Sequence, residues 1–197
     1  MGHPLDREHT DGRSQRRART RLAIVEAHTA MLREGQLKPT AAQVAERAGV
    51  SVRTLWGAFG DMEGLLQATT SYWMSADDEL RTVIDPDTPL PERIEAYCAE
   101  RVRRLEGIAP GARSAQLMEP FSAALTASRR THLGRAVEDA ERTFAAELAA
   151  CSDPDATRDA LVASVSWNAW SLLRDDLDRS VEQAQRAMVV AVSALLS

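Results

Sequence analysis

The sequence of 197 residues contains few cysteines, and none of them stands in a metal or redox motif. Cys98 and Cys151 are its only cysteines, and each lies in a segment that we expect to be helical. We therefore expect two reduced thiols and no disulfide framework. The four histidines are scattered along the chain, without partners at the spacing of zinc ligands. The sequence predicts no metal site and no cofactor.

Long apolar runs are also missing. The longest unbroken apolar run, residues 187–192, has six residues, whereas a membrane-spanning helix needs roughly 18. The first 20 residues are polar and rich in arginine, without the apolar core and cleavage site of a secretory signal. We therefore expect no membrane association and a cytoplasmic location.

The signatures of common catalytic sites are absent as well. The sequence has no Gly-rich phosphate loop, no His-Glu metal pair at helical spacing, and no serine or cysteine beside a plausible base. Apolar residues make up 44% of the chain and charged residues 27%, which is typical of a folded globular protein. We predict no catalytic residues and a protein that is not an enzyme.

The charge is distributed unevenly along the chain. Residues 1–76 carry ten basic and eight acidic side chains, whereas residues 77–197 carry fourteen basic and twenty-one acidic ones. Within residues 13–53, nine basic side chains stand against three acidic ones. A basic N-terminal segment in a chain of net charge −5 indicates local contact with a polyanion, since such contact depends on a patch rather than on overall charge.

Hydrophobic spacing predicts an all-α protein, because apolar residues recur every three or four positions and strand-length β-branched runs are missing. Gly35, Pro39, Gly49 and Gly60 mark the first helix boundaries. Three prolines within residues 85–91 predict a break without helix, and we place a soft domain boundary just before it. The predicted helices are residues 17–34, 41–48, 51–58, 62–83, 92–106, 112–118, 124–150, 154–174 and 180–196.

The two short helices at 41–48 and 51–58 have the features of a helix-turn-helix unit. Ala45 stands where the helices would approach most closely, Gly49 allows a sharp turn, and Leu55 would pack the second helix onto the first. The side chains of Val44, Ala48, Val50 and Phe59 would complete a small core. An Arg-rich helix precedes this unit. This combination favours DNA binding.

The sequence of this segment resembles the DNA-binding head of the TetR (tetracycline-repressor-like) family of bacterial transcriptional regulators. The resemblance covers residues 17–68 and is clearest in the run from Ala45 to Trp56, followed by Phe59 and by residues 61–66. It implies a three-helix DNA-binding domain, which we place at residues 13–68, and a helical effector-binding and dimerisation domain at residues 69–197. The rest of the chain agrees with the family only in length and helix pattern.

The resemblance implies phosphate contacts by Thr40, Thr54 and Trp56, where Trp replaces a usual Tyr. Ala58 and Met62 depart from the family pattern, because a His and a Lys often stand there, so the N-terminal arm is expected to supply more of the affinity. Arg53 is the best candidate for reading a base, since arginine pairs well with guanine. The predicted DNA-binding residues are Arg13, Arg16, Arg17, Arg19, Thr40, Ser51, Val52, Arg53, Thr54, Trp56 and Gly57, with Arg21 as a further member of the arm.

Large apolar side chains at helical spacing in the second domain favour either an ordinary core or a ligand cavity with a few polar groups. The predicted ligand-binding residues are Trp73, Tyr97, Arg101, Met118, Phe121, Trp167, Asn168 and Trp170. Asn168 attracts attention because it lies between two tryptophans in a helix rich in Ala, Ser and Leu. The sequence does not decide which face of that helix it occupies.

The last two predicted helices, 154–174 and 180–196, combine apolar residues with many small ones, so they would either close the core of one chain or form a four-helix interface between two. We expect a homodimer that acts as a repressor by binding a palindromic operator in double-stranded DNA. A small apolar effector is expected to release the dimer from this operator. The alternative is a helical small-molecule-binding protein with a degenerate DNA-binding head.

Overall fold

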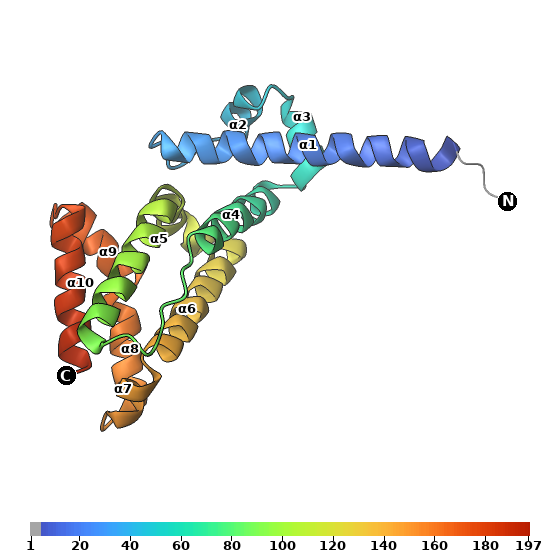
Figure 1. Ribbon diagram of the computed structural model, residues 1–197. Helices are drawn as coiled ribbons and strands as arrows, with labels where there is room; N and C mark the ends of the chain where they lie inside the picture. Colours follow the sequence, from blue (N-terminus) through green and yellow to red (C-terminus); the bar gives the residue numbers. More distant parts are fainter. Residues whose placement is uncertain (1–4) are drawn as a thin grey trace. The chain divides into compact units, whose positions relative to one another are not determined.

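The computed structural model describes the backbone of residues 5–197 and the side chains of residues 12–197, and all its regular elements are helical. This confirms the predicted all-α fold (Figure 1). The α-helices are α1 (Leu5–Arg33), α2 (Ala41–Arg47), α3 (Val52–Phe59), α4 (Met62–Glu79), α5 (Leu90–Met118), α6 (Ala123–Thr143), α7 (Ala145–Ala150), α8 (Pro154–Ser164), α9 (Trp167–Ser171) and α10 (Val181–Leu195).

The chain divides into two compact units. The head unit comprises the residues up to Trp73 together with Pro110–Ser128, and the body unit comprises Met74–Ala109 together with Arg129–Ser197. No helix crosses residues 81–89, as the three prolines there predict. The functional boundary expected after residue 68 stays a prediction, because compactness alone assigns no function to either side of it.

In the head unit, α2 and α3 both pack against α1 (Figure 1). Val44, Leu55 and Leu65 are fully buried and form one apolar cluster with Ile24 and Ala45. Ala48, Val50 and Phe59 pack against this cluster. The small core predicted from the sequence is therefore present.

Local sequence signals set the helix ends. Gly35 and Gly49 have φ angles of +86° and +67°, a left-handed conformation that costs glycine little, and they end α1 and α2. Thr40 and Ser180 each form a capping box with the glutamine three residues later. The side chain of Asp153 caps α8, and Pro154 occupies the first turn of that helix.

The structure corrects the predicted break between the helices 92–106 and 112–118, because α5 continues through Pro110. A proline inside a helix removes one backbone hydrogen bond. Packing on both sides of it favours the continuous helix: Ala109 is buried, and Gly111 lies so close to Trp73 that an added Cβ would be 2.7 Å from the indole Nε1. Gly111 therefore provides close packing rather than a helix end.

Other helix limits differ from the sequence predictions. The predicted helix 124–150 is divided at Phe144, whose buried ring packs edge-on against Tyr97. The predicted helix 154–174 is divided before Ser166, whose hydroxyl accepts a hydrogen bond from the backbone of Ala169 and so begins α9. A π-helical turn, Leu172–Asp176, follows α9. In addition, α1 begins before the predicted residue 17, and α4 ends before the predicted residue 83.

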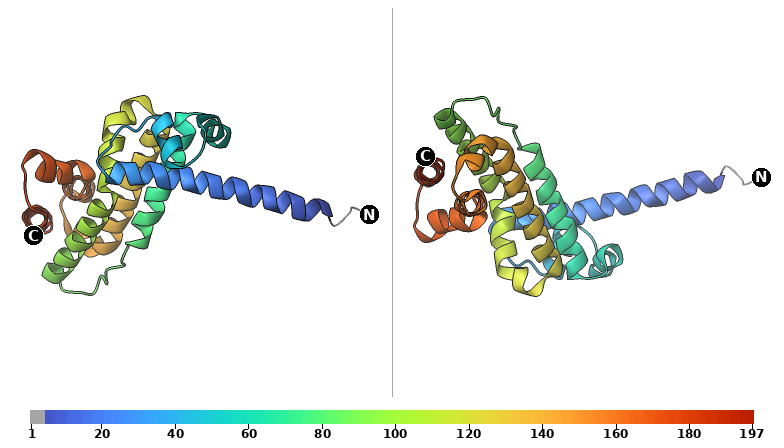
Figure 2. Two further views of the ribbon diagram at one scale, coloured as in Figure 1. Left: turned by 90° about the horizontal axis from the view of Figure 1, so that it is seen from above. Right: turned by 90° about the horizontal axis from the view of Figure 1, so that it is seen from below.

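The body unit has its own apolar core, built from α5 to α10. Trp170, Phe144 and Leu161 are fully buried in it, and α10 contributes Met188 and Val192. Helix α10 packs beside α8, and Figure 2 shows these two segments side by side in red and orange. The body unit thus has an apolar core of its own.

Candidate nucleic-acid interface

The turn between α2 and α3 is built by backbone geometry and one cap. Gly49 takes the left-handed conformation, and the amide of Val50 donates to the carbonyl of Ala45 at 2.9 Å. Ser51 then caps α3 by accepting from the amide of Thr54 at 3.0 Å. The second helix of the pair therefore begins at a defined point and in a defined direction.

Helix α3 has one buried anchor and an exposed opposite face. Leu55 is fully buried, whereas Val52, Arg53, Thr54 and Gly57 are exposed. A Cβ added to Gly57 would meet no atom within 4 Å, so the fold itself does not need a glycine there. This face offers a guanidinium, a hydroxyl, a methyl-rich side chain and an open stretch of backbone to a partner.

Three of the predicted contact residues also have local structural roles. The hydroxyl of Thr40 caps α2, and the hydroxyls of Ser51 and Thr54 lie 2.8 Å apart at the start of α3. All three residues are exposed, so their hydroxyls remain reachable from outside. Trp56 is half-buried, and part of it packs against the head core.

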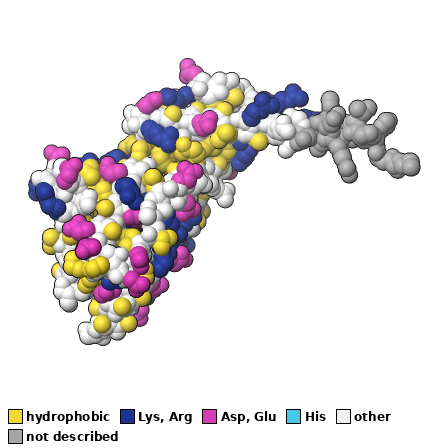
Figure 3. All heavy atoms as spheres, viewed as in Figure 1, with side chains coloured by type: hydrophobic (Ala, Val, Ile, Leu, Met, Phe, Trp, Pro, Cys, Tyr) yellow, Lys and Arg dark blue, Asp and Glu magenta, His cyan; other side chains and the backbone are white. Residues whose placement is uncertain are grey.

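The predicted arm lies on α1. Arg13, Arg16, Arg17 and Arg19 are all exposed, and Figure 3 shows Lys and Arg side chains along the described part of this helix. The Nε of Arg16 donates to the carbonyl of Gly12 at 3.3 Å. Because the arm is helical, these guanidinium groups project from the surface of one helix rather than from an extended chain.

Arg21 is engaged with α3. Its guanidinium donates to the carbonyl of Ala58 and lies 4.3 Å from the centre of the Phe59 ring. It therefore holds the C-terminal end of α3 against α1. A guanidinium at the end of a helix interacts favourably with the terminal carbonyl groups.

Ala58 and Met62, the two departures from the family pattern, are half-buried and pack against the head core. Neither side chain has a hydrogen-bond donor for a phosphate.

Two further contacts hold α1 in place. Arg47 forms a two-pronged ion pair with Glu34 at 2.6 Å, and the buried His28 Nδ1 lies 2.8 Å from the hydroxyl of Thr69. Burial lowers the pKa of His28 to about 4, so this histidine is neutral at pH 7.

The predicted ligand-binding residues fall in both compact units. In the head unit, Trp73 is buried under the guanidinium of Arg33, 4.8 Å from its ring centre, whereas Met118 is half-buried and Phe121 is 84% exposed. The body unit contains Tyr97, Arg101, Trp167, Asn168 and Trp170.

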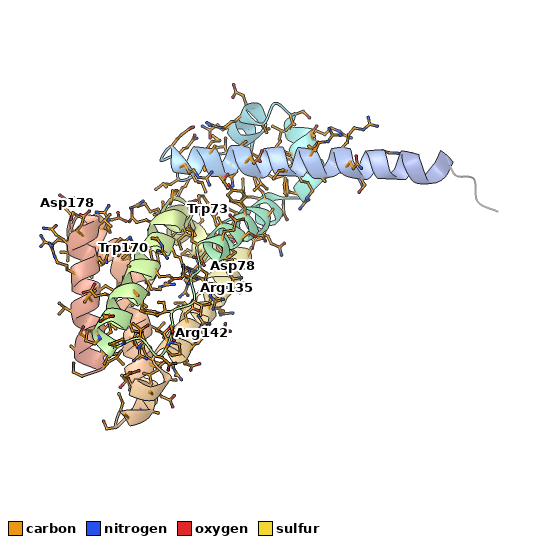
Figure 4. All side chains as sticks on the ribbon, in the orientation of Figure 1. Trp73, Asp78, Arg135, Arg142, Trp170 and Asp178 are labelled. Atoms are coloured by element: carbon orange, nitrogen blue, oxygen red, sulfur yellow. The ribbon has the colours of Figure 1, made fainter. Side chains whose placement is uncertain are left out.

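Within the body unit, Tyr97, Arg101 and Trp170 are fully buried. The indole of Trp170, labelled in Figure 4, donates to the Glu106 carboxylate at 2.8 Å. Trp167 is half-buried and Asn168 is exposed, so Asn168 occupies the outer side of α9. The structure therefore brings Tyr97 and Arg101 together inside the body unit and leaves Asn168 at its surface.

A network of buried charges in the body unit was not predicted from the sequence. Arg104, fully buried on α5, donates to Asp77 at 2.7 and 2.8 Å, to Asp139 at 2.8 Å and to Glu100 at 3.1 Å. The spacing of Glu100 and Arg104 is a helical ion-pair spacing that the sequence displays. Asp77 and Asp139 come from α4 and α6, and no local pattern links them to Arg104. At the edge of this region, Arg135 pairs with Asp78 at 2.8 Å (Figure 4).

Over the described residues, no cluster of three or more His, Cys, Asp or Glu side chains has the geometry of a metal site. None of the described helices is both long and apolar enough to span a membrane.

Taken together, α1, α2 and α3 form a helix-turn-helix head whose second short helix presents a polar face, next to a basic helix. Two solved structures resemble the chain over almost its whole length. One, described as a TetR-family transcriptional regulator, comes from Mesorhizobium loti MAFF303099; it is 21% identical, with a TM-score of 0.58, over 92% of this chain and 96% of that one. The other, described as a transcriptional regulator, comes from Rhodococcus sp. Rha1; it is 16% identical, with a TM-score of 0.61, over 91% of this chain and 95% of that one.

At these identities the similarity shows a shared fold, which is the fold that the resemblance at residues 17–68 implies. No protein-family model and no curated protein matches the chain.

Proposed function

We propose that the protein is a DNA-binding transcriptional regulator. The observation that carries this proposal is the exposed face of α3, which Leu55 anchors from behind and which lies in the same unit as four exposed arginines of α1. A short helix anchored in this way fits the major groove of DNA, and the arginines of α1 would contact phosphates. The solved structures that share the fold are described as transcriptional regulators, which supports the proposal.

Arg53 is the proposed base-reading residue, since a guanidinium can pair with guanine through two hydrogen bonds. Thr40, Ser51, Thr54 and Trp56 would position the head on the backbone. Val52 would contact a thymine methyl, and Gly57 would let the backbone of α3 approach the DNA closely. These roles agree with the exposure of Thr40, Ser51, Val52, Thr54 and Gly57, whereas Trp56 is half-buried.

The proposed active form is a homodimer, which would place two copies of α3 about 34 Å apart on a palindromic operator. Of the apolar residues in the proposed interface helices, Leu161, Val165 and Val192 already serve the core of their own chain. Leu172 and Val190, which are 50% and 68% exposed, remain for a partner. A smaller interface than the sequence pattern suggests is therefore expected.

We further propose that the regulator represses transcription and that a small, mainly apolar effector bound by the body unit releases it from the operator. A regulator of this kind would work in the cytoplasm of a bacterium. Thermodynamic linkage requires that an effector which weakens DNA binding is itself bound more weakly by the DNA complex. Equal effector affinity with and without operator would contradict this mechanism.

The first experiment is selection from random duplex DNA by the full-length protein, followed by titration of the selected duplex at several salt concentrations. A palindrome with half-sites about one helical turn apart is expected, with an affinity that falls on the order of 10³-fold between 50 and 200 mM salt. Replacing Arg16, Arg17 and Arg19 by alanine should flatten this salt dependence, whereas Arg103→Ala, an exposed change in the body unit, should not. Failure to select any sequence would instead favour a small-molecule-binding protein with a degenerate head.

A further inference from the structure

The body unit buries an arginine whose hydrogen bonds are incomplete. Arg101 lies on α5 with no exposed surface, and its Nη2 donates to the carbonyl of Val165 at 3.1 Å. Its Nε and Nη1 are buried and have no hydrogen-bond partner among the described residues. A buried guanidinium is costly unless an anion or several acceptors compensate for the lost water.

The neighbouring carboxylates are already engaged elsewhere. Asp77, Glu100 and Asp139 all accept hydrogen bonds from Arg104, one turn farther along α5. Asp139 also accepts from Arg81 and Arg142. Burial is the main cause that lowers the pKa of Arg101, although Tyr97, Glu100 and Asp77 act in the opposite direction. The chain therefore buries the charge of Arg101 without supplying an acceptor for two of its donor atoms.

Two more side chains beside Arg101 have a buried polar atom without a hydrogen-bond partner among the described residues. Tyr97 precedes Arg101 by four residues, so both share one face of α5, and its buried hydroxyl has no described partner. The Nε2 of His132, on α6, is also buried without one. Burial and the nearby charge of Arg101 lower the pKa of His132 to about 4, with Asp77 opposing the shift, so its ring is neutral at pH 7.

Both carboxylates and apolar side chains surround these polar atoms. Nδ1 of His132 lies 3.8 Å from Oδ2 of Asp77. The Tyr97 ring packs edge-on against Phe144, with ring centres 5.1 Å apart, and both belong to the core cluster that contains Val165 and Trp170. Water could hydrogen-bond to the polar atoms, but it would bring no negative charge to Arg101. A carboxylate has two oxygens, each able to accept more than one hydrogen bond, and it carries the opposite charge.

We propose that Arg101, together with Tyr97 and His132, binds the carboxylate of an apolar small molecule inside the body unit. Because Nε and Nη1 lie on opposite edges of the guanidinium, one carboxylate accepts from only one of them, and the hydroxyl of Tyr97 donates to the same group. The neutral ring of His132 contributes one further hydrogen bond. The apolar part would lie against core residues around them, such as Phe144 and Val165. That this molecule is the effector rests on the function proposed above; the site itself does not.

The test is direct binding to the full-length protein in the absence of DNA. The probes are sodium octanoate and sodium benzoate, each compared with its neutral amide, octanamide or benzamide. Titration calorimetry and the shift in melting temperature are expected to show binding of at least one carboxylate, and at least tenfold weaker binding of the corresponding amide. Equal binding of acid and amide, or no binding of either acid, overturns the proposal.

Three variants locate the site. Arg101→Met removes the charge at similar length and should weaken carboxylate binding about 100-fold, because a buried charge-assisted contact is lost. Tyr97→Phe removes only the hydroxyl, should fold normally, and should weaken binding about tenfold. Arg103→Met, on the exposed side of the same helix, should leave binding unchanged. If Arg101→Met fails to fold, Tyr97→Phe alone decides. If both Tyr97→Phe and a folded Arg101→Met bind the carboxylate with full affinity, the proposed site is wrong.

The same titrations distinguish this site from the regulatory function. Carboxylate binding that disappears in Arg101→Met establishes the site whether or not the protein selects a DNA sequence. If the bound carboxylate leaves the affinity for the selected duplex unchanged, the site stands and its role as the effector site is wrong. If a DNA sequence is selected but neither acid binds, the regulator stands and the carboxylate site is wrong.

Discussion

Among the described residues, the body unit buries arginine side chains and the head unit does not. In the head, arginines 13, 16, 17, 19 and 53 are exposed, and the buried polar pair His28 and Thr69 is hydrogen-bonded. In the body, Arg101 and Arg104 are fully buried, and the hydrogen bonds of Arg101 are incomplete. Exposed cations suit a large polyanion that approaches from outside, whereas a buried cation suits one anionic group that the protein encloses. The contrast therefore supports the two proposals, a polyanion as the partner of the head and one anionic group as the partner of the body.

The largest expected effect breaks the buried network of the body. Arg104→Ala leaves Asp77, Glu100 and Asp139 without their shared guanidinium, so the free energy of unfolding should fall by about 3 to 5 kcal/mol. Urea denaturation measures this loss. The matched change in the head, Arg47→Ala, breaks only an exposed ion pair with Glu34 and should have little effect. Similar losses in both variants would refute the distinction between buried and exposed charges.

A second prediction compares one histidine in each unit. His28 and His132 both have a pKa lowered from 6.5 to about 4 by burial, so the unfolded chain binds more protons than the folded one between these values. The stabilisation that comes from burying each neutral histidine is therefore fully present above pH 6.5 and is lost as the pH falls from 6.5 toward 4. Over that window each histidine should lower the free energy of unfolding by on the order of 2 to 3 kcal/mol. Urea denaturation at pH 7 and pH 5 should show a clear loss.

The variants His28→Gln and His132→Gln assign this loss to the two units. Each should make stability less dependent on pH between 7 and 5, because a glutamine does not titrate. The lowered pKa values of Asp77 and Asp139 do not interfere, since their contribution is lost only below the ordinary range of a carboxyl group. Unchanged pH dependence in both variants would show that these histidines are solvated.

A third prediction concerns the exposed face of α3. Arg53→Ala should cost about 1 to 3 kcal/mol of affinity for the selected duplex and relax its sequence preference at one position of each half-site. Binding titrations with the selected duplex and with single-base variants measure both effects. The thermal stability should not change, because Arg53 is exposed. A loss of affinity that is equal for all duplexes would make Arg53 a phosphate contact instead.

The smallest expected effect on stability comes from a substitution in α3 of the head unit. Gly57→Ala places a better helix former in α3 where the added Cβ meets no atom of the protein, so the head should gain about 0.5 to 1 kcal/mol of stability. If the backbone of α3 approaches DNA closely, the same methyl group should weaken duplex binding. Melting and binding measured on one preparation test both. Tighter or unchanged DNA binding would place Gly57 away from the DNA.

Much of the head could be predicted from the sequence because its signals are local. The glycines at 35 and 49, the caps at Thr40 and Ser51, and the apolar spacing around Leu55 each act within a few residues, and the structure contains all of them. Arg21 was the exception. Its contact with Ala58 and Phe59 joins residues far apart in the chain, so counting it with the arm was the natural interpretation.

The body was less predictable because its important contacts join separate helices. The amino-acid sequence by itself determined an all-α chain, the order of most helices, their caps and the helix-turn-helix head, since these depend on backbone preferences and short-range periodicity. Only the tertiary structure decided that α5 continues through Pro110, that Asn168 faces outward, and that Arg101, Tyr97 and His132 are buried with unpaired polar atoms. The physical reason is that burial and hydrogen bonding depend on which distant residues pack together, and a single helix pattern does not contain that information.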